Sequence, residues 1–368
     1  MIFDSESVFE ENVITVLKQH GWKDGVLRYP TERDLLDNWK DILYRNNNDI
    51  DRLGKYPLTD GEMTQIIEQI ETLRTPLALN SFVNGRTVSI TRDNKEDVAH
   101  FGKEVSLYIY DRKEIAGGKS TYQIAQQPVY PAKNKMLNSR RGDLVLLING
   151  MPLIHIELKK SGIPVSQATN QIEKYAHEGV FTGLFRLVQI FVAMNPDDAV
   201  YFANPGVDKF NPSYYFHWAD YNNEPICGGQ NPGKDEWKLF IGGTSGTAGL
   251  LSIPMAHQLI GFYTIADSAD GCLKVLRSYQ YIAANAISDV VRKCDWEQRP
   301  TTPGRPGGYV WHTTGSGKTM TSFKSAQLIA DSHDADKVVF LMDRIELGTQ
   351  SLKEYRSFAD SETEVQGT

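Results

Sequence analysis

The distribution of apolar and polar residues along the chain predicts alternating strands and helices. Short apolar runs bounded by Gly, Asn, Asp or Pro indicate strands, and apolar residues at helical spacing indicate helices. We predict strands at residues 81–91, 104–110, 187–194, 199–204, 309–311 and 337–342, and a hairpin within 143–160. We predict helices within 55–75, from 165 to about 179, at 273–293 and from 318 to about 330. Residues 222–249 are rich in Gly, Asn and Pro and are interpreted as a loop or linker.

The hairpin has the clearest signal, because two apolar runs flank Asn149-Gly150. Alternate residues of a strand share a face, so Glu157 and Lys159 should project together from the second strand. With Asp143 at the head of the first strand, they form an arrangement typical of metal-dependent nucleases. Two carboxylates can hold Mg²⁺ and leave positions for water and a phosphate oxygen, and a lysine can orient or deprotonate that water. The alternative is a surface hairpin with ordinary charges at its ends.

The length of the turn decides whether the two carboxylates can meet. With a two-residue turn and regular pairing, Asp143 faces Ile156, and Glu157 points to the opposite side of the sheet. The carboxylates share a face only if the loop contains three residues, 149–151, or if a β-bulge shifts the pairing.

The helix predicted after the hairpin places Gln167, Gln171 and Tyr175 on one face, four residues apart. Two amides and a phenol beside a carboxylate site could hold a DNA phosphate or the lysine. The alternative is a helix whose polar stripe faces solvent.

A phosphate-binding loop is predicted at residues 312–319, which read His-Thr-Thr-Gly-Ser-Gly-Lys-Thr between a predicted strand and a predicted helix. The glycines allow backbone N–H groups to surround phosphate oxygens, Lys318 supplies a cation, and Thr319 supplies a hydroxyl ligand for Mg²⁺. His312 stands where the usual pattern begins with glycine, and the alternative is a chance glycine-rich turn. The residues expected to contact the nucleotide or its Mg²⁺ are Thr314, Gly315, Ser316, Gly317, Lys318 and Thr319.

Composition narrows the class of protein. Apolar residues make up 40% and charged residues 23%, which is typical of a globular chain. The first residues do not resemble a signal peptide, no apolar run is long enough to span a membrane, and the three cysteines are widely spaced. We therefore expect a cytoplasmic protein with no disulfide framework, no zinc site and no membrane partner.

Charge is unevenly distributed. The net charge of −7 argues against a uniformly basic nucleic-acid surface, but residues 131–175 contain seven basic and three acidic residues. We predict a local basic cleft, and the alternative is a solvated charged face. The basic residues are Lys133, Lys135, Arg140, Arg141, Lys159, Lys160 and Lys174.

Taken together, these motifs resemble the restriction (R) subunit of type I restriction–modification enzymes. The resemblance rests on Asp143, Glu157-Leu158-Lys159 and Gln171-x-x-x-Tyr175, followed by a helicase-type phosphate loop. Gly142 stands where that family often has proline. The resemblance implies that Asp143 and Glu157 bind the metal and that Lys159, Gln171 and Tyr175 also take part in cleavage.

The N-terminal segment and the second half of the chain extend the resemblance. It implies that an acid among Glu6, Glu10 and Glu11 lies near the metal, without choosing one. It also implies that Gln280 reads adenine, since an amide can pair with its donor–acceptor edge. Residues 343–350 look like the next superfamily 2 helicase motif.

The resemblance further implies an α/β fold in two parts: a PD-(D/E)xK-type nuclease domain with a mixed sheet at 1–245, and a first RecA-like lobe of a superfamily 2 helicase at 246–368. No apolar strand ending in an Asp-Glu pair follows the phosphate loop, so we interpret the lobe as truncated and expect no ATPase activity from it. The implied cofactors are Mg²⁺ and ATP, and the implied partners are double-stranded DNA and the methyltransferase (M) and specificity (S) subunits. The alternatives are a helicase whose N-terminal domain only binds nucleic acid, and a non-catalytic assembly module.

Overall fold

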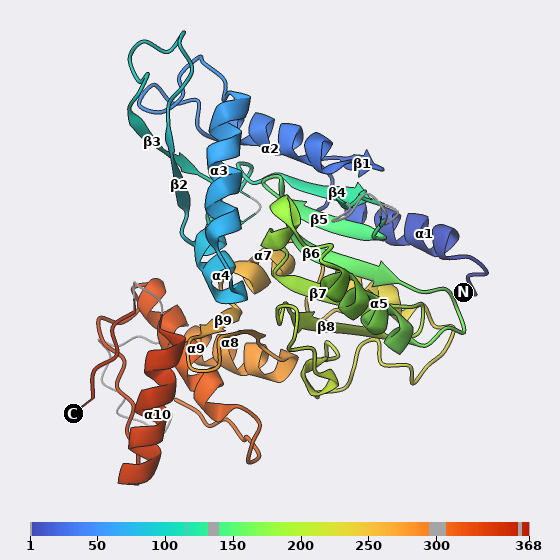
Figure 1. Cartoon of the computed structure of the whole chain (residues 1–368). Coiled ribbons are helices and arrows are strands. Elements are labelled where there is room, and N and C mark those ends of the chain that lie inside the picture. The colour runs from blue at the N-terminus through green and yellow to red at the C-terminus, as the bar shows by residue number, and fades with distance from the viewer. Residues whose placement is uncertain (1, 116, 132–139, 294–306, 360–362, 368) are drawn as a thin grey trace.

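The computed structural model of the chain describes residues 2–115, 117–131, 140–293, 307–359 and 363–367 (Figure 1). Its helices are α1 (Glu6–Gln19), α2 (Glu32–Asn46), α3 (Asp60–Thr72), α4 (Pro76–Asn84), α5 (Val165–Glu178), α6 (Glu236–Gly242), α7 (Met255–Gly261), α8 (Ser278–Lys293), α9 (Lys318–Asp331) and α10 (Ile345–Phe358), with 3-10 turns η1 (Gly183–Leu187) and η2 (Pro212–Tyr214). Its strands are β1 (Val26–Arg28), β2 (Thr87–Thr91), β3 (Glu104–Tyr108), β4 (Tyr122–Gln126), β5 (Leu144–Ile148), β6 (Met151–Leu158), β7 (Ile190–Met194), β8 (Ala199–Ala203), β9 (Thr264–Asp267) and β10 (Cys272–Val275).

A six-stranded mixed sheet in the order β1-β4-β5-β6-β7-β8 forms the centre of the N-terminal part. The β1–β4 and β6–β7 pairs are parallel, and the other neighbouring pairs are antiparallel. Both faces of the sheet are covered (Figure 1). On one face α5 packs through Ile172 against Phe191 and Phe202, and on the other α1 packs through Phe9 against Trp237 of α6. The predicted mixed α/β architecture is confirmed.

The β5–β6 hairpin has a two-residue turn and a β-bulge. Both turn residues have positive φ, 52° for Asn149 and 82° for Gly150, as an Asn-Gly hairpin turn requires. Beyond the turn Leu147 pairs with Pro152. The pairing then shifts, because Leu146 lies opposite Ile154 and the residue before Ile154 has no partner. The hairpin prediction is confirmed. The bulge shifts the pairing register by one residue, which a two-residue turn with regular pairing would not do.

Two sequence assignments in the N-terminal part were wrong. Residues 81–84, predicted as strand, belong to α4, because the Thr75 hydroxyl caps the helix at Ala78 N and Pro76 occupies its first turn. Part of the predicted linker 222–249 forms α6, which buries Trp237 and Phe240 against α1. The Gly-, Asn- and Pro-rich composition of the segment did not indicate this helix. Tertiary packing of three apolar side chains within its seven residues stabilises it.

In the C-terminal part α9 is confirmed, and α8 starts at Ser278 because residues 272–275 pair with β9 instead. Residues 309–311 and 337–342 were predicted as strands but are not, and Tyr309 and Trp311 are 90% and 89% exposed. A strand requires a hydrogen-bonded neighbour, and neither segment pairs with one in the described part of the chain. Among the described helices, none has the length and apolar composition needed to span a lipid bilayer.

Candidate active site

The bulge brings two carboxylates together at the end of the β5–β6 hairpin. Because Leu144 pairs with Ile156, the next position on each strand places Asp143 beside Glu157. Asp143 Oδ2 accepts a hydrogen bond of 2.7 Å from Leu158 N. The surface-hairpin alternative is wrong, since the Glu157 side chain is fully buried.

Burial makes ionisation of these two carboxyl groups energetically unfavourable. Both oxygens of Glu157 lack a hydrogen-bond partner among the described residues. Burial raises the pKa of Glu157 to about 8, and burial followed by the charge of Glu157 raises the pKa of Asp143 well above its ordinary value. A divalent cation would offset both charges, so the two residues fit Mg²⁺. No group of three or more His, Cys, Asp and Glu suited to a metal occurs in the described residues, so the remaining ligands would be a backbone carbonyl and water.

Lys159 lies on the same face, as the alternation of β6 predicts. Its Nζ donates to the carbonyl of Leu158 at 2.9 Å and lies 3.6 Å from Oε1 of Glu157. A third contact, of 3.6 Å, reaches Oε1 of Glu6 on α1. The ammonium is therefore held at the edge of the carboxylate pair, within reach of a water bound there.

Two of the three N-terminal acids face this centre. Glu6 approaches Lys159, and Glu10 is buried and accepts hydrogen bonds from Gln126 and Gln127. The charge of Glu10 also contributes to the raised pKa of Asp143. Glu11 instead pairs with Arg28 at 2.6 Å. The i, i+4 spacing of Glu6 and Glu10 is a signal that could have selected them.

On α5, Tyr175 is buried and its hydroxyl donates to the carbonyl of Arg141 at 2.9 Å. Gln171 Nε2 donates to the same hydroxyl at 2.6 Å, whereas Gln167 is exposed. The solvent-facing alternative is therefore wrong for Tyr175. The hydrogen bond of Tyr175 therefore links α5 to the backbone of Arg141, two residues before Asp143.

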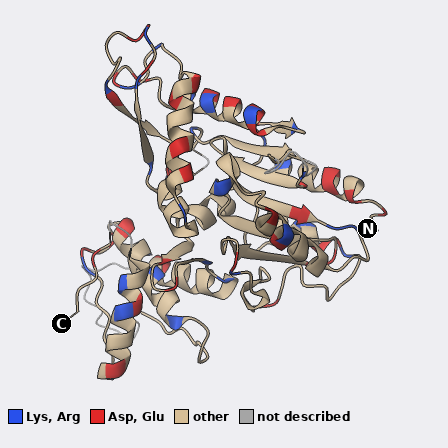
Figure 2. Ribbon diagram, in the orientation of Figure 1, with Lys and Arg blue, Asp and Glu red and all other residues tan. Residues whose placement is uncertain are grey.

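The predicted basic cleft is only partly described. Arg140 makes two hydrogen bonds to Glu178, Arg141 stacks over the ring of Tyr29, and Lys160 donates to a backbone carbonyl. Lys133 and Lys135 lie outside the described residues. Elsewhere, acidic and basic residues alternate along α2 and α10 (Figure 2). Apart from Lys159, which lies at the carboxylate pair, the described cations of this segment contact other groups of the protein surface, which favours the charged-face interpretation for them.

Two buried neighbours of the carboxylates were not predicted from the sequence. His155 lies two residues before Glu157 on the same face of β6, with its Nε2 3.3 Å from Glu157 Oε2. Its Nδ1 lies 2.8 Å from the hydroxyl of Tyr130. Burial lowers the pKa of His155 to about 4, so the ring is neutral. The strand alternation that selected Glu157 and Lys159 could also have selected His155.

The second site is the phosphate loop before α9. Gly315 and Gly317 have φ of +77° and +80°, the left-handed region that favours glycine. Lys318 Nζ donates to the carbonyl of Thr313 at 3.1 Å, and His312 Nδ1 lies 2.9 Å from the Ser316 hydroxyl. The loop thus leads into a helix N-terminus, where backbone N–H groups favour an anion.

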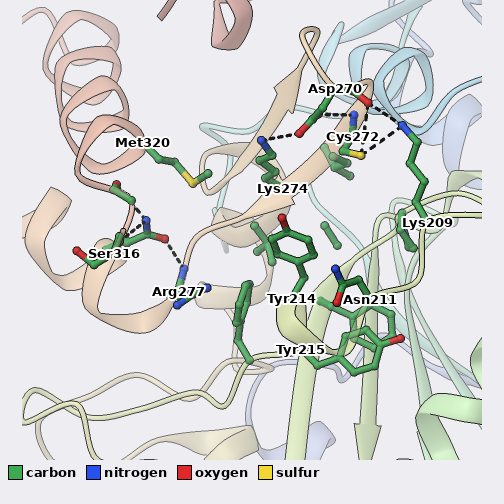
Figure 3. Close-up of a pocket in the computed structure, with 18 of the residues that line it drawn as sticks. Lys209, Asn211, Tyr214, Tyr215, Asp270, Cys272, Lys274, Arg277, Ser316 and Met320 are labelled. Carbon is green, nitrogen blue, oxygen red and sulfur yellow. Dashed lines mark hydrogen bonds and ion pairs between the residues drawn. The ribbon is translucent and has the colours of Figure 1, made fainter. Parts of the chain in front are cut away.

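A cavity of about 190 Å³ lies beside the loop (Figure 3). Aromatic residues of segment 214–216 form one wall, β10 forms another, and residues 315–317 with Met320 form the third. Arg277 stacks over the Phe216 ring, 4.4 Å from its centroid. Gln280 lines the cavity, and its Nε2 lies 3.3 Å from the carbonyl of Gly317. Adenine reading by Gln280 stays a prediction, but the residue does join the cavity to the loop.

The raised pKa of Glu157 predicts how stability depends on pH without divalent ions. A carboxyl whose pKa is higher in the folded than in the unfolded state favours folding below about 4.5, and this contribution disappears as pH rises through about 8. Thermal unfolding in EDTA should therefore occur at lower temperature at pH 8.5 than at pH 5. In Glu157→Gln the decrease should be smaller, and Mg²⁺ should reverse it in the unaltered chain only. An identical pH dependence in both chains would contradict the assigned environment of Glu157.

Two family models match the chain. The type I restriction enzyme R protein N terminus (HSDR_N) matches residues 4–210, which include the carboxylate pair and α5. The SWI2/SNF2 ATPase matches residues 279–368, which include the phosphate loop.

Two curated relatives from staphylococci match almost the whole chain, and one from Escherichia coli matches over half of it. A type I restriction enzyme endonuclease subunit of Staphylococcus aureus is 32% identical over 98% of this chain and 34% of its own length. A type I restriction enzyme endonuclease subunit of Staphylococcus saprophyticus is 31% identical, also over 98% of this chain and 34% of its own length. The EcoprrI endonuclease subunit of Escherichia coli is 29% identical over 57% of this chain and 62% of its own. The chain spans about a third of the length of the two staphylococcal relatives.

Proposed function

The chain belongs to the family of type I restriction enzyme R proteins, and from this premise we propose that it is the DNA-cleaving and ATP-dependent DNA-translocating subunit of such an enzyme. Residues 1–245 would act as a PD-(D/E)xK-type nuclease domain that hydrolyses phosphodiester bonds in double-stranded DNA. The observation that carries the proposal is the pairing of half-buried Asp143 with fully buried Glu157, which a bulge aligns beside Lys159.

In the proposed cleavage reaction, Asp143, Glu157 and the carbonyl of Leu158 would hold Mg²⁺. The bound cation supplies Lewis-acid chemistry and lowers the pKa of coordinated water. Lys159, 3.6 Å from Glu157, would orient the attacking water and offset negative charge on the phosphate as an ammonium, or would take the proton of that water as a neutral amine. As the water oxygen bonds to phosphorus, the bond from phosphorus to the leaving sugar oxygen breaks and that oxygen takes a proton.

Gln171 and Tyr175 would support this reaction indirectly, by holding the backbone near Asp143 in place. The Tyr175 hydroxyl fixes the backbone at Arg141, and Gln171 holds that hydroxyl. We infer that α5 thereby keeps Asp143 at its place beside Glu157, and that neither residue binds the metal itself.

In the proposed motor, residues 246–368 contribute the first RecA-like lobe of a superfamily 2 helicase. Lys318 binds the β- and γ-phosphates, Thr319 binds the accompanying Mg²⁺, and Gln280 reads adenine in the cavity beside the loop. The partners would be double-stranded DNA and the methyltransferase (M) and specificity (S) subunits, in the cytoplasm.

The second function class is a helicase whose N-terminal domain only binds nucleic acid. A half-buried and a buried carboxylate on one face argue against it, because they offer a phosphate backbone no attractive charge and would repel it once ionised. A non-catalytic assembly module is the third class, and it too has no need of such a pair.

Titration calorimetry of the nucleotide-free chain with Mn²⁺ at pH 8 tests the proposal. One ion should bind per chain, and Asp143→Asn should abolish this binding. Asp51→Asn, which changes an exposed carboxylate that is not part of the carboxylate pair, is the matched control and should bind as the unaltered chain does. Absence of Mn²⁺ binding, or normal binding by Asp143→Asn, would refute the metal site.

A further inference from the structure

His155 is a buried polar residue beside the carboxylate pair to which the proposed reaction gives no role. It lies on the same face of β6 as Glu157 and Lys159, and its side chain is fully buried. The rings of Phe181 and Phe191 pack against its imidazole with centroids 5.5 and 6.0 Å away. An unpaired polar group in such an apolar setting is costly, so its two nitrogens need partners.

Each nitrogen faces one polar atom. Nδ1 lies 2.8 Å from the Tyr130 hydroxyl, and Nε2 lies 3.3 Å from Oε2 of Glu157. If the hydroxyl donates to Nδ1, the ring proton resides on Nε2 and points toward Glu157. Both Nε2 and Oε2 lack a hydrogen-bond partner among the described residues, and the distance between them is short enough for them to become each other's partner.

We propose that His155 is a positioning residue for Glu157: held by Tyr130, it donates from Nε2 to Oε2 and so leaves Oε1, the oxygen facing Lys159, for the metal. This inference rests on the proposed metal site. A hydrogen bond to one oxygen of a metal-binding carboxylate fixes the orientation of the other, and such supporting bonds contribute strongly to metal affinity.

Gly142 provides independent support, because it leaves the space that this pair requires. A Cβ at residue 142 would lie 2.5 Å from the Tyr130 hydroxyl oxygen and 2.9 Å from Cε1 of His155. Any side chain there would displace one ring or the other.

Direct ligation of the metal by His155 is the competing role. The described residues contain no group of three or more His, Cys, Asp and Glu arranged for a metal, although His155, Asp143 and Glu157 are neighbours. The Nε2 atom also lies 3.3 Å from Oε2 of Glu157, which is close enough for a donor to that carboxylate.

The test measures Mn²⁺ affinity of the nucleotide-free chain by titration calorimetry, with thermal unfolding in EDTA to establish folding. His155→Phe should weaken binding about 10–100-fold, the usual effect of losing such a supporting bond. His155→Gln places an amide N–H near the position of Nε2 and should restore most of the affinity. His177→Gln, at an exposed histidine of α5, is the matched control and should leave affinity unchanged.

Gly142→Ala and Tyr130→Phe test the same arrangement if His155→Phe does not fold. Both should weaken Mn²⁺ binding, because each disturbs the ring without altering a carboxylate. Unchanged affinity in the folded His155 variant, or in both of these, would overturn the inference and leave the metal site intact. A ¹⁴N coupling to bound Mn²⁺ from His155 in pulsed EPR would make it a ligand and also overturn it. Absence of Mn²⁺ binding by the unaltered chain would overturn the inference together with the proposed function.

Discussion

Glu157→Ala is expected to abolish DNA cleavage and to leave ATP hydrolysis unchanged. Removing this side chain deletes one of two protein carboxylates that the proposed metal site depends on. Metal chemistry contributes several kcal/mol to phosphodiester hydrolysis, so we expect a loss of ~10³-fold or more. The ATPase should be spared, because Lys318 and its loop belong to a separate site before α9.

The measurement is nicking of supercoiled plasmid by a complete subunit, of the length of its relatives, assembled with its partner subunits. Glu68→Ala, an exposed acid on α3, is the control and should cut normally. The free energy of unfolding should distinguish loss of chemistry from loss of folding. Glu157→Gln keeps the shape of the side chain and removes an unpaired buried charge, so it should fold at least as stably. Cleavage at the unaltered rate by either variant would show that the carboxylate pair is not the nuclease centre.

Lys318→Ala is expected to stop ATP-driven translocation and, with it, any cleavage that depends on translocation. The ammonium now donates to the carbonyl of Thr313 in its own loop, a position from which it can turn to a bound phosphate. Charge-assisted hydrogen bonds of this kind contribute about 1.5–3 kcal/mol, so nucleotide affinity should fall about 10–100-fold. Turnover should fall further, because the charge that develops on the γ-phosphate would lose its counter-ion.

ATP hydrolysis and displacement of a DNA triplex by the complete subunit measure this effect. Lys337→Ala, an exposed lysine beyond α9, is the matched control. Mn²⁺ binding at the carboxylate pair should be normal in Lys318→Ala, which separates the two sites. Continued translocation by Lys318→Ala would exclude this loop as the motor's nucleotide site.

The sequence by itself determined the local features of both sites. Asn149-Gly150 required positive φ at both turn positions, and the period of two placed Glu157 and Lys159 on one face of β6. The glycines at residues 315 and 317 likewise determined the shape of the phosphate loop. These features depend on backbone conformations that neighbouring residues restrict directly.

Tertiary structure decided which side chains meet. The extra residue in β6 could not be read from the apolar pattern, because register depends on how the whole hairpin packs within the sheet. The choice of Glu6 and Glu10 over Glu11 depends on how α1 docks near the end of β6. Burial then places Glu157 beside His155 without water, because the packed core excludes the solvent that would otherwise form hydrogen bonds with both side chains.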